Sequence, residues 1–375
     1  MYPPNYQLLY PLSWFLAAAT SFYFAVQESR DYQRNALAVT YVLAIGLIFT
    51  TDPYLLVDWP LISIPFLIAT TIYTLPILFV DRNIVDLSST PLFQRLRIIM
   101  STWSNIRKHS LPVDSVDLLE DSKRHRILFA VCRSARALSV WYTNRTLIAL
   151  LPYGILVHGI TISDFAPDKQ HFLPELNKHD LVLRGFYFMF WIWRVYVDIT
   201  LPHDICAVVF VSILGWDQPA TWPSLFGNMS KAYSVRRFWG VFWHRLHLEP
   251  LAAVTRTFTP FVLNYSKRPS STTTGALRSL WIFLLSAVYH AFVNLVLLRK
   301  NTTKEEVLFF MSNWAVCFLE TVSGRIMKRL GIDCHSDSMV ITLVGRLVGR
   351  AWVLGFFVCA IPAWQYPLVY ASFDG

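Results

Sequence analysis

The chain has 375 residues, of which 54% are hydrophobic and only 15% are charged, and its mean hydropathy is +0.42. This composition excludes an ordinary soluble domain and indicates a membrane protein. The formal net charge is +9, but there is neither a dense basic tract nor a nucleic-acid-binding module. We therefore expect the basic residues in cytosolic loops and expect no nucleic acid partner.

Long apolar stretches recur along the chain, and an α-helix needs about 20 mostly apolar residues to cross the hydrocarbon core. The first stretch lacks the charged start and cleavage site of a signal peptide, so we interpret it as a retained span. The sequence predicts an all-α bundle of about eight transmembrane helices, at 8–26, 36–50, 61–80, 146–163, 184–201, 277–298, 305–321 and 339–363. The shorter apolar run at 205–216 is re-entrant, interfacial or an extension of its neighbour.

Lys and Arg gather in three segments between these spans, and such residues are retained on the cytosolic side. We therefore predict a cytosolic insertion at 81–145, a second cytosolic segment at 216–276 and a third at 325–329. Both termini would then be lumenal. No boundary between domains is visible, so residues 1–375 are interpreted as a single polytopic membrane domain.

His290 lies near the middle of the predicted span 277–298, where an ionisable group is costly and calls for a partner or a function. Burial favours the neutral imidazole, which can accept a proton as a general base. Ser286 and Asn294 stand one turn away on either side and can orient the ring. The alternative is a histidine that bonds to a neighbouring helix without a catalytic role.

The stretch "FWGVFWHRLH" at 238–247 places two histidines among aromatic residues. If Val235–Leu248 is helical, Trp239 and Trp243 share an apolar face, which is typical of an amphipathic helix at the cytosolic surface. His244 and His247 would face a reaction chamber, or merely the lipid headgroups. We predict no metal site, because no Cys, Asp or Glu nearby completes one, and the five cysteines show no C-x-x-C spacing.

Two further pairs of charged residues fall inside predicted spans. Arg194 and Asp198 stand four residues apart and can form an ion pair within one helix, for which a structural role is favoured. Arg346 and Arg350 are also one turn apart. They either snorkel to the cytosolic interface, which is favoured, or contact an anionic ligand such as a nucleotide phosphate.

The segment from Trp222 to His247 resembles the signature of wax synthase-like members of the membrane-bound O-acyltransferase superfamily, in particular fungal enzymes that acetylate terpenoid and meroterpenoid hydroxyl groups. That signature has a Trp-Pro-x-Leu-Phe-Gly element, then a Ser-x-Arg-x-Phe-Trp run that ends in Trp-His. The matching residues here are Trp222, Pro223, Leu225, Phe226, Gly227, Ser234, Arg236, Phe238, Trp239, Trp243 and His244.

The resemblance implies a catalytic base at His290 and an assisting group at His244. It implies acyl-CoA, most simply acetyl-CoA, as co-substrate, with no permanently bound cofactor. It also implies a lipophilic alcohol as acceptor and a multi-pass location in the endoplasmic reticulum membrane. Residues expected to contact substrate or CoA are Trp239, Trp243, Arg236, His247, Ser286 and Asn294. Two alternatives stay open: a long-chain wax ester or storage-lipid acyltransferase, and a proton-coupled transporter.

Overall fold

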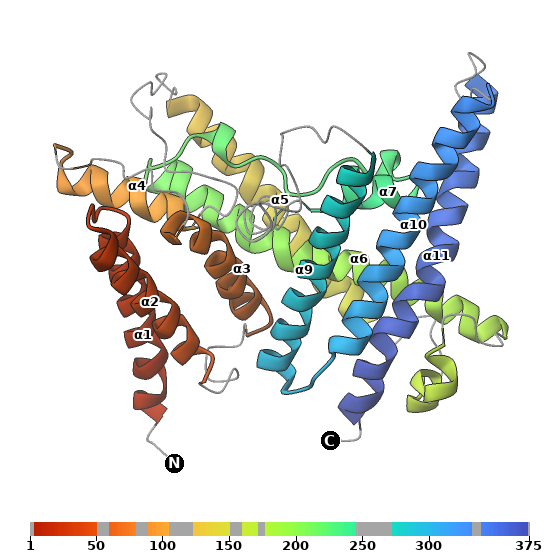
Figure 1. Ribbon diagram of the computed structural model, residues 1–375, viewed down its shortest axis with the longest axis horizontal. Helices are drawn as coiled ribbons and strands as arrows, with labels where there is room; N and C mark the ends of the chain where they lie inside the picture. The colour runs from red at the N-terminus through yellow and green to blue at the C-terminus, as the bar shows by residue number, and fades with distance from the viewer. Residues whose placement is uncertain are drawn as a thin grey trace.

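The computed structural model describes residues 4–50, 60–79, 87, 89–104, 123–150, 160–171, 177–244, 246, 272–331 and 339–373. Within these ranges the regular elements are helical (Figure 1). The α-helices are α1 (Pro4–Ala25), α2 (Asp31–Ile48), α3 (Pro60–Phe79), α4 (Leu92–Ser104), α5 (Lys123–Leu150), α6 (Lys178–Ala207), α7 (Val235–Arg237), α9 (Thr272–Leu298), α10 (Thr303–Arg329) and α11 (Met339–Phe373). The predicted all-α class is confirmed for the described chain.

Two clusters of buried apolar side chains hold the helices together. The first contains side chains of α1, α2, α3 and α4, together with Tyr289 and Val293 of α9. The second joins α6, α9, α10 and α11 to the segment at 225–243. Helix α9 therefore contributes to both clusters, and it stands between the α1–α3 group and the α10–α11 pair in Figure 1.

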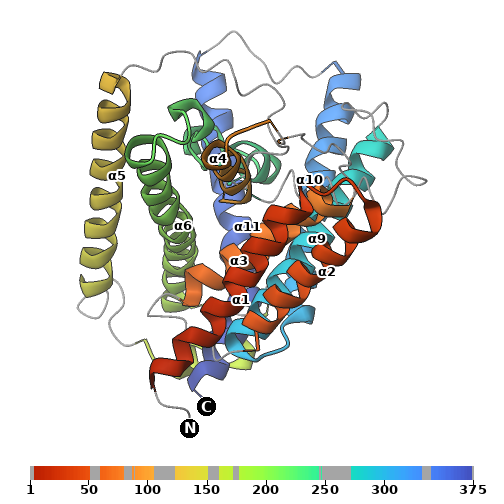
Figure 2. The ribbon, with the colours of Figure 1, turned by 90° about the vertical axis from the view of Figure 1, so that its left-hand side faces the viewer.

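Polar contacts fix which helix ends lie on the same side of the bundle. Near the start of α2, Arg34 donates through Nη2 to the carbonyl oxygen of Ile77 near the end of α3, at 2.7 Å. On the opposite side, Lys300 between α9 and α10 donates to the carbonyl of Ala371 near the end of α11. Both termini lie at this second side, at the bottom of Figures 1 and 2.

In the part of the chain that the structure describes, four helices are long and apolar enough to cross a membrane: Lys178–Ile213, Gly275–Leu298, Thr303–Arg329 and Val340–Ser372. They match four of the predicted spans. Helices also occupy 8–25, 36–48 and 61–79, whereas the predicted span at 146–163 coincides only with the end of α5 and with residues 160–163, and 151–159 lie outside the described residues.

The apolar run at 205–216 extends its neighbour. Helix α6 continues without a break into a π-helical segment, η5 (Val208–Ile213), and the chain turns at Gly215, whose φ is +64°. Glycine adopts such a left-handed conformation without the steric cost that a side chain brings.

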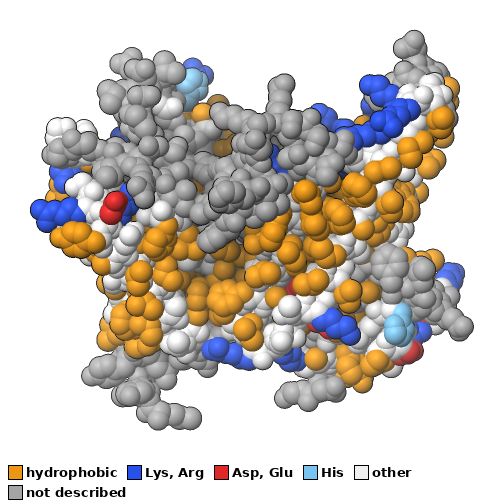
Figure 3. All heavy atoms as spheres, viewed as in Figure 1, with side chains coloured by type: hydrophobic (Ala, Val, Ile, Leu, Met, Phe, Trp, Pro, Cys, Tyr) orange, Lys and Arg blue, Asp and Glu red, His pale blue; other side chains and the backbone are white. Residues whose placement is uncertain are grey.

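The surface view agrees with a membrane-embedded bundle. Hydrophobic side chains cover the middle of the face in Figure 3, and Lys and Arg gather mainly along its upper and lower rims. Leu16, Leu43, Leu319 and Val348 are each more than half exposed on their helices. Lipid contact accounts for such exposure, because hydrocarbon chains solvate apolar side chains as well as a protein core does.

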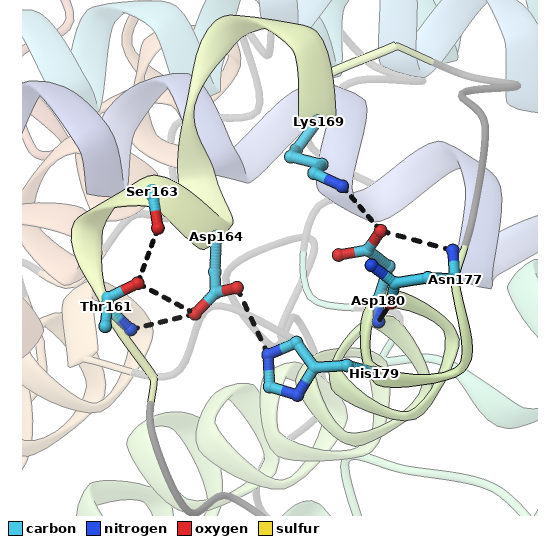
Figure 4. Close-up of polar contacts among 7 residues, drawn as sticks. All are labelled: Thr161, Ser163, Asp164, Lys169, Asn177, His179 and Asp180. Carbon is cyan, nitrogen blue, oxygen red and sulfur yellow. Dashed lines mark hydrogen bonds and ion pairs between the residues drawn. The ribbon is translucent and has the colours of Figure 1, made fainter.

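A polar cap orders the chain where α6 begins (Figure 4). Asn177 accepts from the backbone N–H of Asp180, and Lys169 forms an ion pair with the Asp180 carboxylate at 2.6 Å. The hydrogen bond from Lys169 to the Asp180 carboxylate raises the pKa of the Lys169 ammonium group. His179 contacts Asp164 at 3.1 Å, and Thr161 lies on the far side of that carboxylate. The arrangement is a helix cap, at the end of α6 remote from 225–243.

Candidate active site

His290 lies among aromatic rings supplied by three helices. Its imidazole stacks on Phe310 of α10, with centroids 5.1 Å apart and planes 26° apart. The indole of Trp364 of α11 meets it edge-on at 6.3 Å, and Tyr289 does so at 5.2 Å. His290 itself is half-buried. The predicted position inside a helix bundle is therefore observed, and among the described residues the imidazole contacts the aromatic rings of Phe310, Trp364 and Tyr289.

The segment at 222–244 packs into the bundle instead of lying on its surface. Ser234 caps α7 by accepting from the N–H of Arg237 at 3.2 Å. Glu320 of α10 accepts from the N–H groups of Val235 and Arg236, both at 2.8 Å. A carboxylate at a helix N-terminus is stabilised by the unpaired N–H groups there. Ser234 of the signature thus caps α7, and the aromatic residues follow directly after this helix.

The helix is shorter than predicted. After α7 the chain forms a π-helical segment, η8 (Phe238–Phe242), and Trp243 is already extended, with φ −63° and ψ 153°. Phe238 and Trp243 are 2% and 6% exposed. Tertiary packing of these rings replaces the amphipathic surface helix that was expected at 235–248. The structure describes the signature from Trp222 to His244, whereas His247 lies outside the described residues.

Gly227 of the signature allows two stretches of backbone to touch. Its N–H donates to the carbonyl of Phe242 at 2.8 Å, and a Cβ at this position would lie 1.9 Å from the carbonyl oxygen of Val241. No side chain fits into that space. The contact fastens the Trp222–Gly227 element to the end of η8, next to His244.

Replacing Gly227 with alanine should therefore destabilise the protein by about 1–3 kcal/mol, the usual cost of overpacking. Gly240 in the same segment is the matched control, because a Cβ there meets nothing within 4 Å. Thermal unfolding in detergent should show a clear loss for Gly227→Ala and little change for Gly240→Ala. Equal melting temperatures would contradict the close contact.

Aromatic rings connect His244 to His290. The His244 imidazole lies 5.4 Å from the Trp243 ring, and Trp243 stacks on Trp191 of α6 at 4.7 Å. Trp191 in turn lies 5.7 Å from Trp364, the ring that meets His290. The two predicted histidines therefore border one continuous aromatic cluster.

Trp239 is fixed in this cluster by a hydrogen bond. Its Nε1–H donates to Oδ1 of Asn313 at 2.8 Å, and Asn313 is fully buried in α10. The indole also lies 6.3 Å from Phe310, which stacks on His290. Trp239 and Trp243, both predicted to contact substrate, thus belong to the aromatic cluster that borders the two histidines.

The side chains one turn from His290 have other partners. Ser286 donates to the carbonyl of Ile282 at 2.8 Å. Asn294 donates to Thr302 and to Glu306, at 3.0 and 2.8 Å. Glu306 is fully buried. It was not among the predicted site residues, although an acidic residue inside the predicted span 305–321 indicates a partner or a function. The predicted roles of Ser286 and Asn294 in orienting the imidazole stay predictions.

The charged pair in α6 forms as expected. Arg194 Nε lies 3.1 Å from the Asp198 carboxylate, one helical turn away. Within the described ranges, no three side chains of His, Cys, Asp or Glu come together as metal ligands would. Aromatic rings of the described residues border both His290 and His244.

Comparisons with known proteins point to the same stretch. The model of the Membrane bound O-acyl transferase family matches residues 222–312, which include the signature segment and His290. Acetyltransferase nanB of Aspergillus nanangensis is 24% identical over 312 residues, which are 78% of this chain and 72% of that protein. Acetyltransferase eriL of Hericium erinaceus is 24% identical over 92% of this chain and 86% of its own length.

A third relative, acetyltransferase spyB of Aspergillus fumigatus, is 28% identical over 48% of this chain, but this covers only 31% of that protein. No solved structure gives a significant match. The matched stretch, the relatives and the apolar helices agree on one assignment. Through residues 222–312 the chain is related to the membrane-bound O-acyltransferase family, and its relatives and apolar helices support an acyltransferase of the membrane.

Proposed function

We propose that this protein transfers an acetyl group from acetyl-CoA to a hydroxyl group of a lipophilic terpenoid or meroterpenoid in the endoplasmic reticulum membrane. The observation that carries the proposal is the aromatic cluster shared by His244 and His290. The names of its relatives support the acetyl donor, because nanB, spyB and eriL are each named an acetyltransferase. The proposal treats residues 1–375 as one membrane domain.

The proposed reaction needs one general base and one group that stabilises negative charge. His290 takes the proton of the substrate hydroxyl while that oxygen attacks the thioester carbonyl. The new C–O bond forms, the C–S bond breaks, and CoA leaves as a thiolate that regains the proton from His290. His244 donates a hydrogen bond to the oxyanion that develops on the carbonyl oxygen.

The ring-lined surroundings favour transfer to an alcohol over hydrolysis. Phe310, Trp364 and Trp243 exclude water from the space next to the imidazoles, which protects the thioester and strengthens electrostatic interactions. Flat apolar rings also suit a polycyclic hydrocarbon skeleton. Such an acceptor would reach the site from the bilayer.

Five cations near Tyr233 in the sequence or on α11 support an anionic donor such as CoA. The tyrosine cation cluster, as we call it, consists of Lys231, Arg236 and Arg237, which lie within four residues of Tyr233, and of Arg346 and Arg350 of α11. The Cζ atoms of Arg237 and Arg346 lie 4.3 and 5.9 Å from the centre of the Tyr233 ring, and Arg350 donates to the carbonyl of Ser230. The close approach of Tyr233 to α11 depends on Gly349, where a Cβ would lie 2.2 Å from the Tyr233 carbonyl oxygen.

Among the described residues, the tyrosine cation cluster carries more positive than negative charge. In the part of the chain that the structure describes, none of its five members forms an ion pair. Glu320 lies beside it, but its oxygens accept from the backbone of α7 and from Trp352. Gathering like charges is unfavourable unless an anion joins them, and the phosphates of CoA would do so. Arg346 and Arg350 therefore have a use beyond snorkelling.

The double substitution Arg346→Gln and Arg350→Gln should raise the KM for acetyl-CoA about tenfold, which corresponds to about 1.4 kcal/mol of binding free energy. The value of kcat should change little, because these side chains do not touch the reacting atoms. Arg329→Gln, an exposed cation at the end of α10 outside the cluster, is the control. An unchanged KM in the double variant would remove the cluster from donor binding.

The substrate classes are tested by incubating membranes that contain the protein with labelled acetyl-CoA or labelled palmitoyl-CoA. Each donor is offered with a terpenoid alcohol and with a long-chain alcohol. The proposal predicts label in the acetyl ester of the terpenoid alcohol. Label mainly in the palmitoyl ester of the long-chain alcohol would instead identify a wax ester synthase.

A further inference from the structure

Helix α5 has a charged and an apolar side, and the charged side faces the protein. Arg133 donates through Nη1 to the Asp204 carboxylate of α6 at 2.8 Å, and Arg136 donates to the same carboxylate through Nε at 2.6 Å. Asp204 is fully buried, and Arg133 also donates to the carbonyl of Trp222. Two of the arginines that gave this segment its cytosolic appearance are thus paired inside the bundle.

The opposite side of α5 is exposed and carries no charge between residues 127 and 142. Its exposed large side chains are Ile127, Leu128, Val131, Leu138, Trp141 and Tyr142, and each of them is between 48% and 67% exposed. The ends of this surface are marked by Arg124 and by Arg145. An apolar surface with aromatic and cationic residues at its ends is typical of a helix that faces lipid.

Contacts with α6 fix the depth of α5. The two helices lie side by side and run in opposite directions: Ser212 donates to the carbonyl of Arg126, and Trp193 donates to Asn144. The length of α5 between those two contacts is about 27 Å, close to the thickness of the hydrocarbon core of about 30 Å. Helix α6 is one of the four helices able to cross a membrane, and α5 accompanies it over this length.

The course of the chain also requires a crossing. Helices α3 and α4 meet at the upper side of Figure 1, and α6 starts at the lower side. In Figures 1 and 2, α5 begins at the upper side and ends at the lower side, beside α6. Helix α5 therefore makes the membrane crossing that was predicted from the sequence for 146–163.

We propose that α5 is a membrane-spanning helix whose face at 127–142 contacts the acyl chains of the lipid bilayer. The cytosolic insertion would then end near Lys123 rather than at Arg145. Arg133 and Arg136 cross with the helix because Asp204 and the Trp222 carbonyl satisfy them. An unpaired arginine at the bilayer centre would cost about 2.5–3.5 kcal/mol on insertion scales.

Cys132 offers a probe in the middle of the proposed lipid-facing surface, since it is exposed. The full chain, with Cys206, Cys317, Cys334 and Cys359 replaced by serine, is labelled at Cys132 with a nitroxide and placed in lipid vesicles. Oxygen dissolves in hydrocarbon, whereas a nickel chelate stays in water. We expect the relaxation of the Cys132 label to respond to oxygen and hardly to nickel.

Two matched positions on α5 complete the experiment, each made with Cys132→Ser. A label at Arg124→Cys should respond mainly to nickel, and a label at Ala137→Cys, on the face toward α6, should respond to neither. A nickel response at Cys132 equal to that at Arg124→Cys would overturn the proposal. Alkylation of Cys132 in the unsubstituted protein, by a water-soluble maleimide applied to both faces of a lipid nanodisc, would also overturn it.

Discussion

His290→Ala is expected to abolish ester formation while the protein still accumulates in the membrane. Loss of a general base usually lowers kcat by about 10²- to 10⁴-fold. The imidazole stacks on Phe310 and meets Trp364, so truncation also leaves a gap between α9, α10 and α11. The measurement is turnover with acetyl-CoA and a terpenoid alcohol in membranes, normalised to the amount of protein.

Two further variants separate catalysis from packing. His290→Gln keeps most of the side-chain volume but cannot act as a base near neutral pH, so it should be as inactive as His290→Ala. Val288→Ala removes an exposed side chain from the same helix and should keep normal turnover. Near-normal kcat in His290→Gln would remove His290 from the proposed mechanism.

His244→Ala is expected to lower kcat by about 10²- to 10³-fold, the usual effect of removing one oxyanion donor. The KM for acetyl-CoA should change little, because the hydrogen bond strengthens only as negative charge develops. His244 packs against Phe226 and Trp243, so the variant's thermal stability is measured alongside its rate. The control is His171→Ala, an exposed histidine in the turn before α6. A His244→Ala rate equal to that of the control would leave His244 with a packing role only.

Hydropathy predicts most of the helices, because a long apolar run is typical of a transmembrane helix. The predicted spans at 184–201, 277–298, 305–321 and 339–363 lie entirely within α6, α9, α10 and α11, and each observed helix is longer than its predicted span. Polar residues extend them beyond the apolar window, as Asn177 and Asp180 do at the start of α6.

Helix α5 could not be predicted as a span by averaging along the chain. Its cations at 126, 133 and 136 recur at helical spacing, so they fall on one side, but a window average counts them wherever they point. Asp204, the partner of Arg133 and Arg136, is 71 and 68 residues away from them in the sequence. Only the fold brings a single carboxylate to two arginines.

The sequence names candidate site residues, whose catalytic roles stay predictions, but it does not predict their arrangement. The signature gave His244, Trp239 and Trp243, and burial in a span gave His290. The buried partners on α10 could not be inferred, because Asn313 and Glu320 act on side chains and backbone 74 to 85 residues away. These long-range contacts also explain why η8 ends at Phe242: packing of Phe238 and Trp243 overrides the helical pattern of 235–248.

The central claim is that transfer of the acetyl group to a lipophilic alcohol and release of CoA are one reaction at His290. It is tested most directly with the purified protein in lipid vesicles, by measuring free CoA thiol and ester together with and without a terpenoid alcohol. The account predicts equal amounts of thiol and ester, formed only when the alcohol is present and lost in His290→Gln. Thiol release without ester, or proton-coupled solute uptake without either product, would contradict it.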